Sequence, residues 1–305
     1  MGIDRGVSGL SNSSQQEQTV YLNGEFMPLS EARVPVLDRG FIFGDGVYEV
    51  IPVYSRHPFR LAEHIARLQQ SLAGLRLADP YPAQQWQDLV QGVVSRNTLD
   101  DQSVYIQVTR GVAPRDHAFP KETPPTIFMM SNALVTPPPV QIEHGVAAIS
   151  ARDIRWDRCD IKATSLLPNV LLRQRAVDAD AAETVLFRDG ILTEGSASNI
   201  FAVERGTLLA PPKDHHMLPG ITYDLVLELA ADHAVPIEIG HFDEARVRAA
   251  DELWITSSTR EVLAIVTLDG EAIGGGTPGP LYRRMYGWYQ DYKQRIMRQG
   301  ETAHG

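Results

Sequence analysis

The chain has 305 residues, of which 43% are hydrophobic and 22% charged, as in folded globular proteins of one or two domains. Its formal net charge of −10 argues against a nucleic-acid partner, and no run of 18 apolar residues predicts a membrane span. Cys159 is the single cysteine, so an intramolecular disulfide and a cysteine-rich metal site are excluded. We expect a cytoplasmic protein, since a reducing compartment fits a lone thiol, and we predict no metal centre.

The N-terminal half combines strands with two helices. Residues 1–18 are rich in Ser, Gln and Gly and lack the apolar segment of a secretory signal, so we expect a disordered tail. Asn23-Gly24 between apolar residues predicts a hairpin. The β-rich stretch Phe41–Tyr54 contains Gly44 and Gly46, which predicts two strand segments around a tight bend. Further along we expect helices over Arg60–Leu77 and Ala83–Arg96, and strands over Val104–Thr109 and Thr126–Met130.

The C-terminal half follows a region, Ala133–Gly145, that contains three consecutive prolines and predicts a linker. Beyond it we expect strands at Val146–Ser150, Glu183–Phe187, Asn199–Val203 and Glu252–Thr256, and helices at Leu166–Asp180, Thr222–Ala231 and Leu281–Met297. The sequence therefore predicts an α+β protein with two domains after the tail. We place a small N-terminal α/β domain at 19–135, the linker at 136–145 and a larger domain at 146–298.

Four lysines occur, and three of them lie among polar, proline-rich or helix-surface residues: Lys121, Lys213 and Lys293. Lys162 instead precedes an apolar helix. It is either a surface charge at the boundary of an element or a reactive amine, which would require a partly desolvated site.

Three further segments have two interpretations each. Glu194 follows a turn and is either a solvated acid or a buried partner for a protonated ring nitrogen. Gly220 precedes a predicted helix whose first N–H groups would suit a phosphate, although Thr222 could simply cap that helix. His64 and Arg67 are three residues apart on one helix, either as a surface pair or as a phosphate clamp.

Taken together and in this order, these segments resemble the fold-type IV, or class IV, aminotransferases, which depend on pyridoxal 5′-phosphate (PLP). The resemblance runs from about Val20 to Val266 and rests on Asp38–Glu49, Glu63–Leu68, Cys159–Lys162, Thr193–Ser196 and Pro219–Thr222. It implies a two-domain fold with a barrel-like sheet in the larger domain, a homodimer, and PLP bound to Lys162 as a Schiff base. It also implies a set of cofactor-binding residues, namely Arg67, Glu194, Ser196, Leu218, Ile221, Thr222, Ser257 and Ser258.

One stretch, Gln107–Pro120, resembles the D-amino acid aminotransferases in particular. In that family an arginine and a histidine in Pro-Arg-x-His bind the substrate carboxylate with a tyrosine, which implies Arg115, His117 and Tyr48 here. The implied reaction moves an amino group from a D-amino acid, such as D-alanine or D-glutamate, to 2-oxoglutarate or pyruvate. The loop of Arg115 and His117 could serve the neighbouring subunit of the dimer.

Three alternatives stay open at this point. The branched-chain L-amino acid aminotransferases and the aminodeoxychorismate lyases share Lys162 and Glu194, and a binding protein could keep the fold without activity. The branched-chain relatives have Tyr-x-Arg where this chain has Tyr105-Ile-Gln107, which favours D-substrates. Three positions depart from the family pattern. Ala197 stands where a second serine is common. Ser257-Ser258 stands where the family has a Ser-Thr pair that contacts the phosphate, and Ser258 keeps the hydroxyl. Arg260 either alters the cofactor surroundings or faces solvent.

Overall fold

The structure, a computed structural model, describes residues 17–300 of the chain and contains two separate β-sheets. The tail predicted for residues 1–18 therefore lies, apart from Glu17 and Gln18, outside the described residues. In the described part no helix is long and apolar enough to cross a bilayer.

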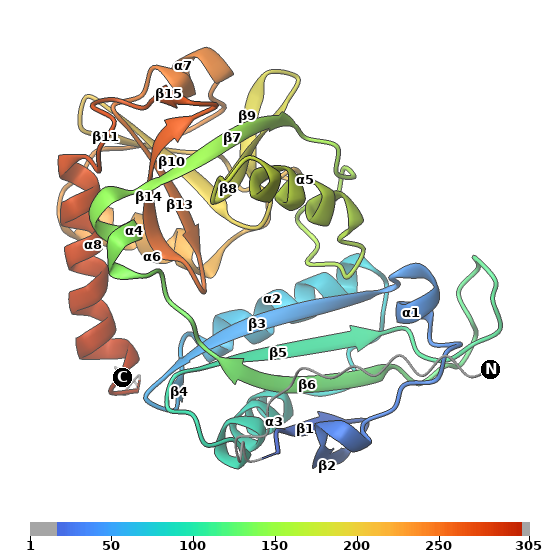
Figure 1. Ribbon diagram of the computed structural model, residues 1–305. Helices are drawn as coiled ribbons and strands as arrows, with labels where there is room; N and C mark the ends of the chain where they lie inside the picture. Colours follow the sequence, from blue (N-terminus) through green and yellow to red (C-terminus); the bar gives the residue numbers. More distant parts are fainter. Residues whose placement is uncertain (1–16, 301–305) are drawn as a thin grey trace, which may run out of the picture.

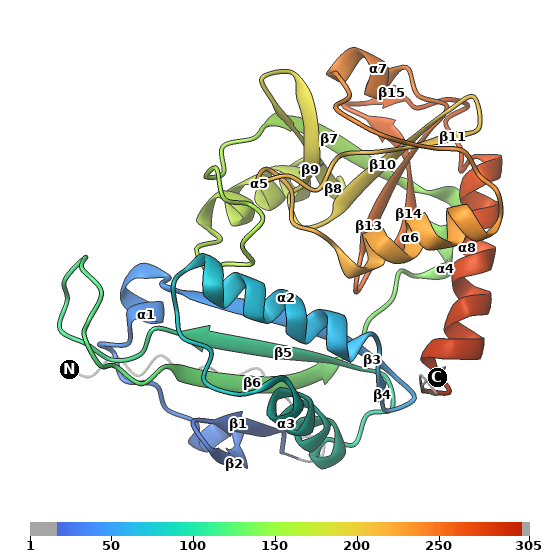
Figure 2. The same cartoon turned by 180° about the vertical axis from the view of Figure 1, so that it is seen from behind.

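The first sheet has six strands in the order β2-β1-β6-β5-β3-β4. The strands are β1 Thr19–Leu22, β2 Glu25–Pro28, β3 Gly46–Tyr54, β4 His57–Pro58, β5 Gln102–Thr109 and β6 Thr126–Ala133. The helices of this part are the short 3-10 turn Leu29–Glu31, α1 Arg39–Phe43, α2 Leu61–Gly74 and α3 Ala83–Arg96. Helices α2 and α3 cover one face of the sheet, in front of it in Figure 2 and behind it in Figure 1. The apolar side chains between these layers form one core, which includes Ile51, Leu68 and Trp86.

The second sheet has nine strands, with eight in the order β12-β11-β10-β13-β14-β7-β8-β9 and β15 paired to β14. The strands are β7 Val146–Arg152, β8 Glu183–Arg188, β9 Ile191–Gly195, β10 Asn199–Glu204, β11 Thr207–Ala210, β12 Ile237–Ile239, β13 Glu252–Ser257, β14 Glu261–Leu268 and β15 Glu271–Ala272. The helices are α4 Pro139–His144, α5 Leu167–Asp178, α6 Ile221–Asp232, α7 Glu244–Arg248 and α8 Pro280–Tyr292, which continues as a π-helical turn, Lys293–Met297.

This second sheet curls around its own core. The N–H of Gly195 at the end of β9 donates to the carbonyl of Ser198 just before β10 (2.7 Å), which joins edge strand β9 to β10 further along the sheet order. Residues such as Val185, Ile200 and Leu253 form a core within the curl, whereas α6 and α8 pack on a second core that includes Phe201 and Trp254. The expected α+β fold with a barrel-like second sheet is confirmed.

One local expectation was wrong. Phe41–Phe43 is helical rather than a strand, because Asp38 accepts a hydrogen bond from the Gly40 N–H (2.8 Å) and Gly44 ends the turn in the left-handed region at φ 65°. The predicted linker contains helix α4, which starts at Pro139, a residue favoured in the first turn of a helix.

The two sheets meet along α2, β3 and the segment around Lys162. The Tyr48 N–H donates to the Lys162 carbonyl (2.9 Å), and the Lys162 N–H donates to the Ser71 hydroxyl (3.2 Å). Arg67 on α2 donates to the Pro219 carbonyl (2.8 Å), just before α6. These bonds fix the edges of a cavity between the sheets.

Candidate active site

A cavity of about 540 Å³ lies between the two sheets, within the usual size range of small-molecule sites. It brings together ten of the residues predicted to act here: Tyr48, Arg67, Lys162, Glu194, Ser196, Leu218, Ile221, Thr222, Ser257 and Ser258. Side chains far apart in the sequence thus face one space.

Lys162 presents its amine inside this cavity. Its Nζ lies 4.1 Å from the centre of the Tyr48 ring, and it forms no ion pair with any residue between 17 and 300. The other lysines differ, since Lys213 pairs with Asp224 and Lys293 with Glu261. Lys293 is buried, so its expected place on a helix surface was wrong.

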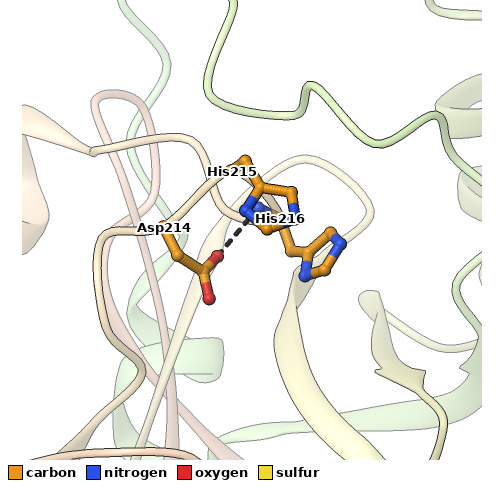
Figure 3. A group of neighbouring side chains, drawn as sticks. All are labelled: Asp214, His215 and His216. Atoms are coloured by element: carbon orange, nitrogen blue, oxygen red, sulfur yellow. Dashed lines mark hydrogen bonds between the residues drawn. The ribbon is translucent and has the colours of Figure 1, made fainter.

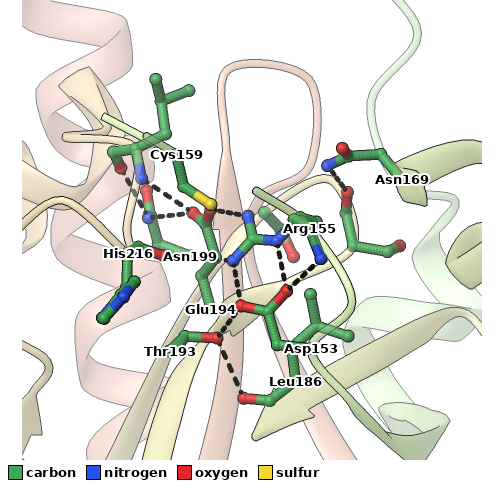
Figure 4. Close-up of polar contacts among 12 residues, drawn as sticks. Asp153, Arg155, Cys159, Asn169, Leu186, Thr193, Glu194, Asn199 and His216 are labelled. Atoms are coloured by element: carbon green, nitrogen blue, oxygen red, sulfur yellow. Dashed lines mark hydrogen bonds and ion pairs between the residues drawn. The ribbon is translucent and has the colours of Figure 1, made fainter. Parts of the chain in front are cut away.

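Glu194 lies near the end of β9 and is almost fully buried. Its carboxylate accepts hydrogen bonds from Arg155, from the Asn199 amide (3.2 Å) and from the Leu218 N–H (3.2 Å). Figure 4 shows Arg155 between Glu194 and Asp153. Two guanidinium nitrogens of Arg155 donate to the Asp153 carboxylate. Burial raises the pKa of the Glu194 carboxyl to about 7, while Arg155 opposes that shift.

The cavity wall at the start of α6 offers unpaired donors. Helix α6 begins after Gly220 with no side-chain cap, so its first N–H groups, at Ile221 and Thr222, have no partner within the helix. The Thr256 hydroxyl is buried, lines the cavity and has no hydrogen-bond partner among residues 17–300. A helix start with a nearby free hydroxyl is a typical phosphate site.

Arg67 completes this side and is held by Glu49. The guanidinium donates twice to the Glu49 carboxylate (2.6 and 2.9 Å) and once to Pro219, which leaves two of its five N–H donors free. His64 also contacts Glu49 (3.1 Å), so His64 and Arg67 are not the exposed surface pair that the sequence left open. Burial would raise the pKa of Glu49, but Arg67 and His64 hold it well below its usual range.

A buried acid that the sequence did not reveal, Glu183, holds the loop after Glu194. Its carboxylate accepts hydrogen bonds from the Ser196 N–H (3.0 Å), the Ser196 hydroxyl and the Ser198 hydroxyl (2.7 Å). Arg260 turns toward it, with Nη1 3.5 Å from Oε2, and donates to the Ala182 carbonyl (2.8 Å). Arg260 is thus half-buried beside this acid rather than facing solvent. Ala197 lines the cavity.

Sequence signals for the other residues of this network were weak. Glu49 lies within the segment that carries the family resemblance, and Glu183 is an acid at the start of an apolar strand. Arg155 stands seven residues before Lys162 in a charged segment, and nothing local distinguishes it from a surface arginine.

Arg115 and His117 do not line this cavity. Both are exposed on the β5–β6 loop and contact the Phe43 ring, with the Arg115 Cζ and the His117 ring centre each 5.4 Å from it. Arg39 donates to the Asp116 carbonyl (2.5 Å) and so holds the loop beside α1. Figure 1 shows this loop projecting from the end of the first sheet. Within one chain, these two residues stay away from Lys162.

A cluster of ligand-type side chains lies outside the cavity at Asp214, His215 and His216 (Figure 3). Asp214 accepts a hydrogen bond from the His216 N–H (2.8 Å), and the two imidazole rings lie 3.9 Å apart. The Asp214 carboxylate thus closes a local turn before Leu218.

Comparison with known proteins agrees with this geometry. The family described as amino-transferase class IV matches residues 46–268. A D-alanine aminotransferase from Bacillus licheniformis is 39% identical over 266 residues, covering 87% of this chain and 94% of its own. One from Staphylococcus haemolyticus is 36% identical over 273 residues, with coverages of 90% and 97%. The structure of a branched-chain aminotransferase from Thermoproteus uzoniensis with norvaline matches with a TM-score of 0.84 at 25% identity, covering 94% of this chain and 97% of that one.

The chain therefore belongs to the class IV aminotransferases and has their fold-type IV architecture. This confirms the family resemblance seen in the sequence and makes the protein an enzyme of amino-group transfer.

Proposed function

We propose that this chain is a D-amino acid transaminase that holds PLP in the cavity between its two sheets. The observation that carries the proposal is the arrangement of the cavity, with a free lysine amine, a buried acid and a helix start with unpaired donors around one space. The similarity to D-alanine aminotransferases over about nine-tenths of the chain supports the choice of D-amino acids.

The residues present fit PLP. Arg67, Ile221, Thr222, Ser257 and Ser258 would hold its phosphate, Leu218 and Ser196 would contact its ring, and Glu194 would face the ring nitrogen. PLP supplies the electron sink of the reaction when its ring nitrogen is protonated. Glu194 would keep the ring nitrogen protonated, because its carboxylate is fixed by Arg155 and shielded from water.

Lys162 would have two roles. Its amine would hold the cofactor covalently, and after a substrate amine displaces it, the free amine would move the proton at the substrate Cα. Tyr48 lies next to the amine and would help to orient the α-carboxylate. With the carboxylate fixed, only one enantiomer points its Cα–H at Lys162.

The assembly is proposed to be a homodimer in which the Arg115–His117 loop completes the neighbour's cavity. Apolar side chains are exposed on α5, on α1 and on the loop before α1, including Leu167, Val170, Leu171, Phe41 and Val36. The two surfaces adjoin, since the Ser165 hydroxyl before α5 donates to the Gly44 carbonyl after α1 (3.0 Å). Contiguous apolar surface of this kind marks an interface, and a second copy would cover it.

Three further features remain part of the proposal. The two sheets would correspond to domains of residues 19–135 and 146–298, joined by residues 136–145. D-alanine or D-glutamate would donate the amino group to 2-oxoglutarate or pyruvate. The compartment would be the cytoplasm, in keeping with a single free, buried thiol at Cys159.

The test is a set of half-reactions with PLP-loaded protein and D-alanine, L-alanine, D-glutamate, L-glutamate and L-leucine. Product 2-oxo acid is measured in a single turnover. We expect D-substrates to react faster by roughly 100-fold or more, because a misplacement of about 1 Å costs that much in rate. Faster reaction of L-leucine than of any D-amino acid would contradict the D-specificity and favour the branched-chain alternative.

A further inference from the structure

Arg173 is a cation on the cavity wall without a carboxylate partner. Helix α5 lines the cavity with Asn169, Val170, Arg173 and Gln174, which recur at helical spacing. Arg173 is half-buried, and its guanidinium makes one long hydrogen bond, to the Ala181 carbonyl (3.4 Å). It forms no ion pair with any residue of the described chain. A guanidinium has five donors, so nearly all of its capacity is free.

The surroundings of Arg173 carry excess positive charge. Burial lowers the pKa of the neighbouring Arg260, and the charge of Arg173 lowers it further, which places the two guanidinium groups within each other's field. The acid at this end, Glu183, is fully buried and already accepts bonds from Thr184, Ser196 and Ser198. The one carboxylate at this end is therefore already engaged, and the only arginine it pairs with among residues 17–300 is Arg260 (3.5 Å).

Arg173 also lies well away from the start of α5. It stands seven residues beyond Leu166, so about 10 Å of helix axis separates the two positions along the cavity wall. Between them the cavity is lined by Asn169 and Val170, and Thr259 and Ala197 lie on its other sides. A substrate with a side chain of several atoms would extend along this wall, whereas a methyl group would not reach its end.

We propose that Arg173 binds the distal carboxylate of a dicarboxylic substrate and so sets a preference for acidic over small D-amino acids and 2-oxo acids. A guanidinium binds a carboxylate through two parallel hydrogen bonds, and the excess positive charge favours an incoming anion. The proposal rests on the transaminase function, since it assigns a group within the same cavity.

The experiment compares Arg173→Met with Arg175→Met in the PLP-loaded enzyme. Arg175 is the matched control because it lies on the same helix, is exposed and does not line the cavity. For Arg173→Met we expect kcat/KM for D-glutamate and for 2-oxoglutarate to fall roughly 10- to 150-fold, the usual effect of losing a hydrogen bond to a charged group. The values for D-alanine and pyruvate should change by less than about 2-fold, within the range of a surface substitution. Arg175→Met should leave all four substrates unchanged, and Arg173→Lys should recover part of the D-glutamate rate.

The PLP dissociation constant, measured by titrating apo-protein, separates this role from a contact with the cofactor phosphate. We expect it to be the same in Arg173→Met and wild type. A weaker affinity of Arg173→Met for PLP, or an equal loss of activity with D-glutamate and D-alanine, would refute the subsite. The transaminase function would still hold in that case, provided that the wild-type enzyme turns over D-alanine. A wild-type enzyme that uses neither D-substrate would instead refute the proposed function itself.

Discussion

At the residue scale, the proposed reaction depends most on the amine of Lys162. Replacing it by alanine should abolish transamination, because both covalent cofactor binding and proton transfer need this amine. The fold should survive, since the side chain makes a single cation–π contact, with Tyr48, worth about 1 kcal/mol. Borohydride reduction followed by peptide mass spectrometry checks the assignment. Label on Lys121, Lys213 or Lys293 would refute it, and Lys213→Ala serves as the control.

Arg155 lowers the pKa of the Glu194 carboxyl, and we expect this effect to appear in the pH dependence of kcat. Burial raises the pKa of the Glu194 carboxyl, so the carboxyl gains a proton and activity should fall as the pH drops through that pKa. The groups facing it are Arg155, which lowers the pKa together with the Leu218 N–H, and Asp153, which raises it. Without Arg155 the pKa rises further, and the acid limb of kcat should move up by roughly 1–3 pH units.

The variant is Arg155→Met, and Arg188→Met is its control. Arg188 also contacts Asp153 (3.3 Å) but does not bind Glu194. The control should keep the wild-type acid limb. If the acid limb of the kcat profile does not shift in Arg155→Met, the protonation of Glu194 does not control that limb.

At the scale of elements, the start of α6 depends on the absence of a side chain at Gly220. A Cβ there would lie 2.0 Å from Oδ1 of Asn199, which itself binds Glu194. Gly220→Ala should therefore weaken PLP affinity by roughly 10-fold or more, because it displaces the helix start and Asn199 together. Titration of apo-protein measures the effect.

Gly287→Ala is the matched control for that substitution. Gly287 lies inside α8, and a Cβ added there would have no neighbouring atom within 4 Å. Alanine should therefore stabilise the helix by up to about 1 kcal/mol and leave PLP affinity unchanged. Equal affinities in both variants would mean that the α6 start does not hold the cofactor.

The sequence predicts an element well when the contacts that stabilise it lie close together in the chain, and poorly when they are distant. The helix Ala83–Arg96 and the Asn23-Gly24 hairpin follow from spacing and turn residues, and both occur as expected. The residues of Phe41–Phe43 favour a strand, whereas the Asp38 cap makes the segment helical. The predicted cavity residues came from the family resemblance. The roles of Glu183 and Arg155 at the site are not predictable from their neighbours, because Arg155 binds Glu194 39 residues away and Glu183 binds Ser196 13 residues away, and these pairs meet only after folding.

At the scale of the whole molecule, the position of the β5–β6 loop predicts shared active sites. Lys162→Ala and Arg115→Ala subunits should each be poorly active at low substrate concentration. If the loop serves the neighbour, a mixed dimer has one site with both residues intact, and random mixing should restore about a quarter of wild-type activity. The mixture is made by refolding both variants together, with each variant refolded alone as the control. No recovery on mixing would place Arg115 in its own subunit's site.

The chain also crosses between its sheets more than once. Beyond residues 134–145, the C-terminal end returns to the first sheet, where Arg298 donates to Asp101 (2.9 Å) and to the Ser55 hydroxyl (2.9 Å). Arg60 and Glu228 form a further bridge, between α2 and α6. The consequence concerns the cooperativity of unfolding, since the cores of two sheets that are joined at several points should unfold together. Wild type should show one urea transition followed by both fluorescence and circular dichroism. Arg60→Ala combined with Arg298→Ala should separate the two probes, whereas the control Arg295→Ala should not. A single shared transition in the double variant would show that other contacts couple the sheets, such as the packing of Tyr54 and Phe59 in the core under α6 and α8.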